Sequence, residues 1–294
     1  MARPASHGRA EVTTPTALAE LAALLPGLTA PATAGAAATP GLLPHPGLLA
    51  LAFCAGLVDS AVGGGGLIQI PALLLFCPGV PVPTVLGTNK AAGIAGTSVA
   101  AVQYARRTRI PWKTLLPGAF TALVFSLLGA RTVSRLDPAL LRPLMLGLLV
   151  VMAIYTFARR GFGETHAPRF AGRTQALLLL LTGAVLGFYD GFFGPGTGSL
   201  LLFVYITLFG FDFLTAAAGA KVSNVATNVS AVAYFVATGH VLWALALPMA
   251  ACNIAGSLTG ARLAMGKGRP YIRILFLLVL AALIVKLGLD LRKH

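Results

Sequence analysis

The stretch "GLVDSAVGGGGLIQIP", residues 56–71, places an aspartate and four consecutive glycines inside the apolar segment 46–77. Each glycine weakens a helix by up to about 1 kcal/mol, and a charge at the bilayer centre costs about 2.5–3.5 kcal/mol. In lipid, non-helical backbone is tolerated only where protein shields it or where it lines a cavity. The stretch therefore predicts a broken helix inside a membrane protein.

The composition of the whole chain supports this interpretation. Of its 294 residues, 57% are hydrophobic and 10% are charged, and the mean hydropathy is +0.84, whereas soluble domains carry about 25% charged residues. We predict an all-α, polytopic membrane protein. The first and fifth of its eight candidate segments exceed the roughly 20 residues of one span; the segments are 46–77, 84–105, 111–131, 139–158, 175–210, 213–237, 240–262 and 271–290.

The net charge of +14 comes from Lys and Arg residues that concentrate in the short loops between these segments. This distribution is typical of topogenic, lipid-facing charge rather than of a nucleic-acid surface. Cys54, Cys77 and Cys252 have no metal-ligand spacing and are expected to be free thiols. We expect no metal, no cofactor and no nucleic-acid partner.

An internal repeat relates two halves of the chain at an offset of 131 residues. The shift aligns Asp59 with Asp190, Trp112 with Trp243, and "SLLGAR" with "SLTGAR". We therefore predict two homologous transmembrane repeats, joined by a basic linker and flanked by a disordered Ala/Pro-rich tail and a basic end; the predicted ranges are 1–45 (tail), 46–158 (first repeat), 159–175 (linker), 176–290 (second repeat) and 291–294 (end).

Four ionisable residues lie well inside the apolar segments, and the repeat makes them two pairs: Asp59 with Asp190, and Lys90 with Lys221. Such residues normally face a partner, a cavity or water. Two interpretations stay open. The carboxylates either pair with the lysines or cap the glycine breaks and so hold the halves together, or they handle a substrate or a coupling proton.

The glycine breaks also predict two half-helices, over residues 67–76 and 199–209. The first N–H groups of a helix have no intrahelical partner and lie at the positive end of its dipole. Paired discontinuous helices in two repeats are typical of a transporter binding site near the midplane. The sequence therefore predicts an anion site between the breaks, and tight helix packing of small residues is the rival interpretation.

The path of segment 46–77 is left open. The segment either crosses once with an unwound middle, which gives a parallel repeat, or forms a re-entrant hairpin, which gives an inverted one. Counts of Lys and Arg give 13 inside against 7 outside for the crossing and 12 against 8 for the hairpin, so they do not decide. The length of the segment favours the hairpin.

Other residues are expected to have no catalytic role. Trp112 and Trp243 are interpreted as interfacial anchors, and His166 and His240 lie in loops. The two membrane aspartates suggest an intramembrane protease, but neither glycine stretch continues into the Asp that a GxGD loop needs. We predict that the protein is not an enzyme.

The quoted motifs resemble those of a known family. "GLVDSAVGGGGLIQIPALL", "LGTNKAAGIAGTSVAAVQYA", "GFYDGFFGPGTGSLL" and "AGAKVSNVATNVSAVAYF" are similar to the paired signatures of the TauE/SafE family of permeases, also called the sulfite exporter or 4-toluene sulfonate uptake permease family. The resemblance covers roughly residues 46–290. It implies a multi-pass carrier in a bacterial inner membrane, with sulfite, thiosulfate, sulfonates or related anions as substrates.

The residues and the resemblance together predict secondary transport of a small sulfur-containing anion, coupled to a proton or another ion. The alternatives are a carrier of another organic anion, or an anion channel or sensor. The lipid bilayer is a partner, and a homodimer is left open. Asp59 and Asp190 are the candidate proton sites; the candidate substrate-binding residues are Gly63, Gly64, Gly65, Gly66, Asn89, Lys90, Gly194, Gly196, Gly198, Ser199, Lys221, Asn224 and Asn228.

Overall fold

The computed structural model of the chain describes residues 44–158 and 167–266. Within these residues every regular element is an α-helix, which confirms the all-α prediction. Residues 1–43 of the predicted tail, residues 159–166 of the predicted linker and the predicted last span, 271–290, lie outside the described residues. The helices are α2 (Pro46–Val62), α3 (Gly66–Phe76), α4 (Val82–Ala105), α5 (Trp112–Val133), α6 (Pro138–Ala158), α7 (Gly172–Phe192), α8 (Thr197–Thr207), α9 (Phe213–Ala237) and α10 (Trp243–Met265).

Both long segments fold as re-entrant hairpins rather than as single crossings. His45, just before α2, stacks on Phe76 at the end of α3, with ring centroids 4.8 Å apart. In the second half, Ala167 N donates to Gly210 O at 2.9 Å, which joins the start of α7 to the end of α8. Each broken segment therefore returns to the side from which it entered.

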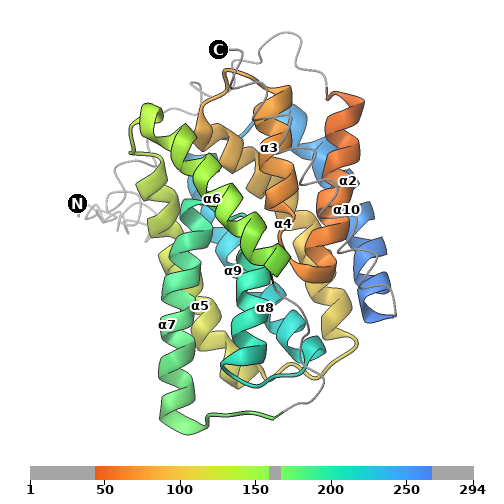
Figure 1. Cartoon of the computed structure of the whole chain (residues 1–294), viewed down its shortest axis with the longest axis vertical. Helices are drawn as coiled ribbons and strands as arrows, with labels where there is room; N and C mark the ends of the chain where they lie inside the picture. Colours follow the sequence, from red (N-terminus) through yellow and green to blue (C-terminus); the bar gives the residue numbers. More distant parts are fainter. Residues whose placement is uncertain (1–43, 159–166, 267–294) are drawn as a thin grey trace, which may run out of the picture.

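The two hairpins enter from opposite ends of the molecule. Figure 1 shows α2 beginning at the upper end of the bundle and α7 beginning at the lower end. The bounds of α8 are those of α3 shifted by 131 residues, and the first residues of α5 and α10 differ by the same number. This arrangement is the inverted one that accompanies the hairpin alternative.

The two halves interlock, because α5 of the first half packs along α7 and α9, and α10 of the second half packs along α2 and α4. Small residues allow these close approaches. A Cβ on Gly187 would overlap the backbone of Ala122 in α5, and one on Gly256 would overlap the backbone of Phe53 in α2. The centre of the molecule is therefore braced by helices from both halves.

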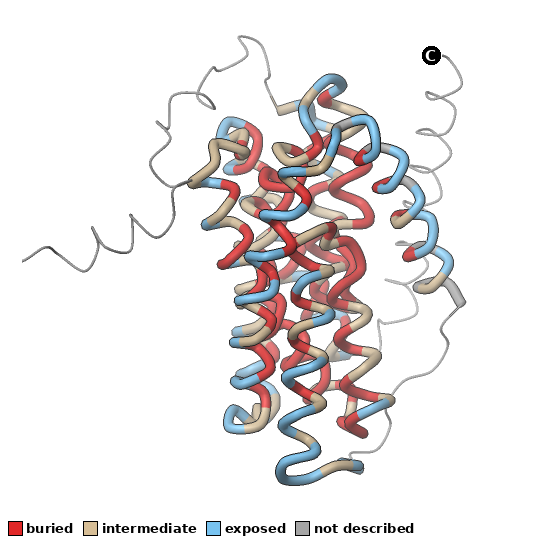
Figure 2. Tube along the Cα trace, turned by 90° about the vertical axis from the view of Figure 1, so that its left-hand side faces the viewer, coloured by how far each residue is buried: buried red, intermediate tan, exposed pale blue. Residues whose placement is uncertain are grey.

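The outer faces of the bundle are apolar. Three described helices, α5, α7 and α10, are long and apolar enough to cross a membrane, and they expose large side chains such as Phe120, Leu177 and Leu247. Figure 2 shows buried positions through the centre and exposed positions along the outer faces. Trp112 and Trp243 are each about half exposed at the first residue of their helices, where interfacial anchors are found.

Candidate functional site

Each hairpin turns at a short glycine-rich break. Gly63 and Gly64 separate α2 from α3 with φ values of 78° and 101°, and Gly194 and Gly196 separate α7 from α8 with φ values of 91° and 82°. Side chains other than glycine rarely adopt this region of φ. The glycines therefore allow the chain to leave one half-helix and restart another within a few residues.

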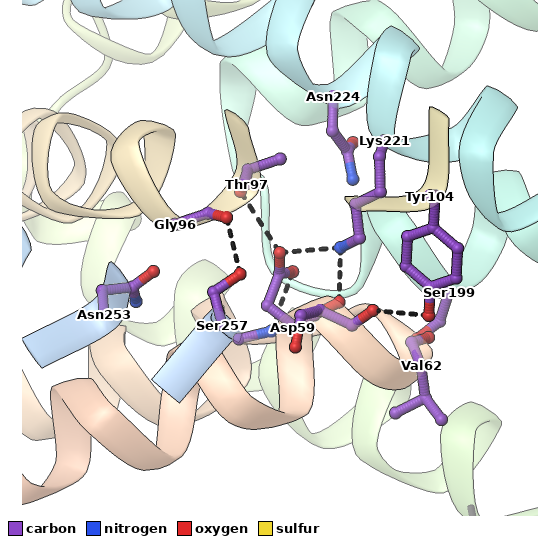
Figure 3. A network of polar contacts seen from close by, with 12 residues as sticks. Asp59, Val62, Gly96, Thr97, Tyr104, Ser199, Lys221, Asn224, Asn253 and Ser257 are labelled. Carbon is purple, nitrogen blue, oxygen red and sulfur yellow. Dashed lines mark hydrogen bonds and ion pairs between the residues drawn. The ribbon is translucent and has the colours of Figure 1, made fainter. Parts of the chain in front are cut away.

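The two breaks pack directly against each other at the centre of the bundle. A Cβ on Gly63 would overlap the backbone of Gly198 and Ser199. Ser199 Oγ donates to Val62 O at 2.9 Å, and Figure 3 labels the two residues close to each other. Gly63 and Ser199 thus join the halves, and neither lines the central cavity. Gly63 was predicted as a substrate-binding residue, and the structure places it against the backbone of the other half, next to the cavity lining rather than in it.

The four membrane charges form two ion pairs, and each pair joins one half to the other. Lys90 Nζ of α4 lies 2.7 Å from Asp190 Oδ2 of α7, and Lys221 Nζ of α9 lies 2.8 Å from Asp59 Oδ2 of α2. Lys90 also donates to Asn228 Oδ1 at 3.1 Å. A buried charge is costly unless it is paired and hydrogen-bonded. The crossed pairs therefore satisfy all four charges and hold the two halves together.

The two aspartates have different surroundings. Asp59 accepts hydrogen bonds from Thr97 Oγ1 at 3.2 Å and from Gly65 N at 3.4 Å, in addition to Lys221. Lys221 also donates to the backbone carbonyl of Asp59, as Figure 3 shows. Among the described residues, Lys90 is the donor to the carboxylate of Asp190. The site is thus symmetric in its charges but unequal in the donors that surround them.

A cavity of about 50 Å³ lies where the breaks and the ion pairs meet. One water needs about 10–15 Å³ by this measure, so the cavity has room for a few water-sized groups. Most of the predicted site residues line it; these are Asp59, Gly64, Gly65, Gly66, Asn89, Lys90, Asp190, Gly194, Gly196, Gly198, Asn224 and Asn228.

Three predicted residues, Gly63, Ser199 and Lys221, do not line the cavity, and five lining residues were not predicted: Gln69, Gly93, Thr97, Thr197 and Asn253. At the repeat offset, Gln69 matches Leu200 and Asn253 matches Ala122. A comparison that looks for identical residues in the two halves therefore passes over both amides. The available signal was a glutamine inside the apolar run "GLIQIPALLLF".

Within the described ranges, no group of three or more His, Cys, Asp or Glu side chains is placed to hold a metal ion. Cys54, Cys77 and Cys252 are free thiols. His240 lies in the loop before α10 with its Nδ1 2.8 Å from Thr238 Oγ1, and burial lowers the pKa of its imidazole.

Comparisons with known proteins agree with this architecture. The family model described as Sulfite exporter TauE/SafE matches residues 48–287. A probable membrane transporter protein of Sinorhizobium sp. is 37% identical over 243 residues, 83% of this chain and 92% of its own length. A probable membrane transporter protein of Haemophilus influenzae is 36% identical over 231 residues, 77% of this chain and 89% of its own length.

The probable membrane transporter protein YfcA of Escherichia coli K12 is 33% identical over 244 residues, 83% of this chain and 89% of its own length. No solved structure matches. Transport across a membrane is the role that these names share, and it is not an enzymatic one. The chain therefore belongs to the TauE/SafE sulfite exporter family of membrane transporters.

Proposed function

We propose that this protein is a multi-pass carrier in a bacterial inner membrane that moves a small sulfur oxyanion together with a proton. The observation that carries the proposal is the central cavity, because both breaks and both ion pairs meet there. Half-helix starts at the midplane of an inverted repeat are the usual binding place of secondary transporters. The N-termini of α3 and α8 favour a negatively charged group there.

The charge balance of the site supports coupling to a proton. Two lysines and two aspartates cancel, so a bare anion entering the cavity finds no net positive charge. Protonation of one aspartate leaves one lysine free to bind the anion. We assign the coupling proton to Asp190, because loss of its negative charge disturbs only the bond from Lys90. Asp59 holds the first break through Gly65 N and also accepts from Thr97 and Lys221, so loss of its charge would disturb all three bonds.

The size of the cavity favours a small anion. Room for a few water-sized groups suits sulfite or thiosulfate, whereas an aryl sulfonate requires the cavity to widen. The choice of a sulfur-containing anion rests on the family to which the chain belongs, Sulfite exporter TauE/SafE. In this scheme Lys90 supplies positive charge, Asn89, Asn224 and Asn228 supply amide groups, and Lys221 acts through Asp59.

The test is transport by the purified protein in liposomes. Charge movement on a solid-supported membrane and tracer flux are recorded with sulfite, thiosulfate, sulfoacetate, an aryl sulfonate and a carboxylate, with and without a pH gradient. We expect saturable, proton-dependent transport of sulfite or thiosulfate that Lys90→Met abolishes. Lys113→Met, which removes an exposed lysine at the start of α5, is the matched control. No response to any sulfur anion by a folded preparation contradicts the sulfur assignment.

A further inference from the structure

The side-chain amide of Gln69, a residue that lines the central cavity, carries an unused hydrogen-bond donor. Gln69 lies in the first turn of α3, is 2% exposed and lines the cavity. Its Nε2 has no acceptor among the residues that the structure describes. A buried donor without a partner is unfavourable, so such groups in native proteins usually have a water, an ion or a ligand as partner.

Asn253 of α10 determines which end of this amide is free. Its Nδ2 lies 3.3 Å from Ala52 O, a backbone carbonyl that can only accept, so the nitrogen of Asn253 must face that side. The same Nδ2 donates to Gln69 Oε1 at 3.1 Å. The oxygen of Gln69 is therefore bound to Asn253, and its nitrogen is left as the free donor.

Close packing holds Asn253 in this position. A Cβ on Gly56 would overlap the backbone of Asn253, and a Cβ on Gly96 would overlap its side chain. Ser257 Oγ, one turn further along α10, donates to Gly96 O at 2.6 Å, as Figure 3 shows. The amide of Asn253 is thus enclosed between α2 and α4 and cannot turn without moving one of them.

The second half of the chain has no counterpart to this pair. The positions that match Gln69 and Asn253 at the repeat offset are Leu200 and Ala122, and both are apolar. Among the described residues, this Gln–Asn pair therefore occurs at the α3 break and is not repeated at the matching positions of the α8 break. A ligand with several equivalent oxygens would be bound off-centre, toward the first half of the molecule.

We infer that Gln69 Nε2, together with the N-terminus of α3, forms the subsite for a deprotonated oxygen of the transported anion, and that Asn253 is its positioning residue. This inference rests on the proposed function. The oxygen bound there accepts from Nε2 and faces the positive end of α3. A cationic or amine group would place a donor against a donor, so the subsite selects for ionised oxyanions.

The first test is the variant Gln69→Leu, which puts the matching residue of the second half at this position. A hydrogen bond to a charged group is lost, so the KM for sulfite or thiosulfate should rise about 10- to 100-fold, with a much smaller change in maximal rate. Gln103→Leu is the matched control. Gln103 Nε2 is also buried without an acceptor among the described residues, but Gln103 does not line the cavity. The KM of Gln103→Leu should therefore equal that of the wild type.

The second test separates positioning from packing. A carboxylate in Asn253→Asp accepts from the amide nitrogen of Gln69 and so occupies the donor that the anion would use. The KM should then rise about as much as in Gln69→Leu, and the double variant Gln69→Leu/Asn253→Asp should show no further rise. Additive effects in the double variant would contradict the positioning role.

Folding is checked for every variant by gel filtration and thermal unfolding, and Gln69→Met replaces Gln69→Leu if that variant does not fold. A folded variant of either kind with the wild-type KM overturns the inference and leaves the proposed function intact. A wild-type protein that transports no anion overturns the proposed function and the subsite with it. Weakened transport of a different oxyanion by Gln69→Leu supports the subsite and overturns only the sulfur assignment.

Discussion

Removal of the ammonium of Lys90 should destabilise the protein far more than removal of the whole ion pair. The side chains of Lys90 and Asp190 are 3% and 6% exposed, and Nζ lies 2.7 Å from Oδ2. At an effective dielectric constant of about 20, unit charges at this distance attract by about 6 kcal/mol. Desolvation of the two groups offsets much of this attraction, and breaking such a pair from one side typically costs about 3–5 kcal/mol.

The prediction is therefore a strongly non-additive double-mutant cycle. Lys90→Met leaves Asp190 as a buried carboxylate without its cation and should lower the free energy of unfolding by about 3–5 kcal/mol. Lys90→Met/Asp190→Leu replaces both charges by apolar side chains and should recover most of that loss, to within about 1 kcal/mol of the wild type.

Unfolding of the purified protein in detergent, followed by circular dichroism and by the fluorescence of Trp112 and Trp243, measures all members of the cycle. Lys221→Met is a useful comparison, because Asp59 keeps the donors Thr97 Oγ1 and Gly65 N after the cation is removed. Lys221→Met should therefore lower the free energy of unfolding by less than Lys90→Met does. Additive losses of unfolding free energy in the Lys90 cycle, or equal losses for the two lysine variants, would contradict this prediction.

Three further predictions concern single residues. Thr97→Val removes one donor to the carboxylate of Asp59 and should lower the free energy of unfolding by about 1.5–3 kcal/mol. Thr121→Val in α5, which removes an exposed hydrogen bond to Pro117 O, should lower it little. Chemical unfolding compares the two variants. Gly63→Ala introduces a Cβ at φ 78° against the opposite break and should prevent expression of folded protein. Gly93→Ala is the control and should be folded, because nothing lies within 4 Å of its added Cβ. Gel filtration distinguishes these outcomes. Burial lowers the pKa of His240 below its ordinary value of 6.5. Between the folded-state pKa and 6.5 the unfolded chain binds more protons than the folded one, so stability should rise with pH across that window. Thermal unfolding from pH 5 to 7.5 should show a weaker pH dependence of stability in His240→Gln than in the wild type.

Much of the fold could be predicted from the sequence because hydropathy, glycine runs and the repeat are local signals. The length of segment 46–77 favoured a hairpin, and the glycines marked where α3 and α8 begin. Charge counting in the loops could not decide the path of this segment. The decisive contacts, such as His45 on Phe76, are tertiary.

The pairing of the charges also depends on tertiary structure. Lys90 follows Asp59 by the same number of residues as Lys221 follows Asp190, so the spacing alone allows pairs within each half. The packing of α4 against α9 brings the two halves together and allows each lysine to reach the aspartate of the other half. Gln69 and Asn253 were missed for the opposite reason, because they break the repeat instead of following it.

The most direct test of proton-coupled anion transport is whether the anion and a proton move together in a way that depends on Asp190. Proteoliposomes that contain a pH-sensitive dye are given an inward sulfite gradient, and the internal pH and tracer uptake are followed at the same time. We expect the wild type to acidify the liposome interior as it takes up the anion, and Asp190→Asn to take up the anion without acidification. Unchanged coupling of proton and anion in Asp190→Asn, or uptake by the wild type with no proton movement, would contradict it.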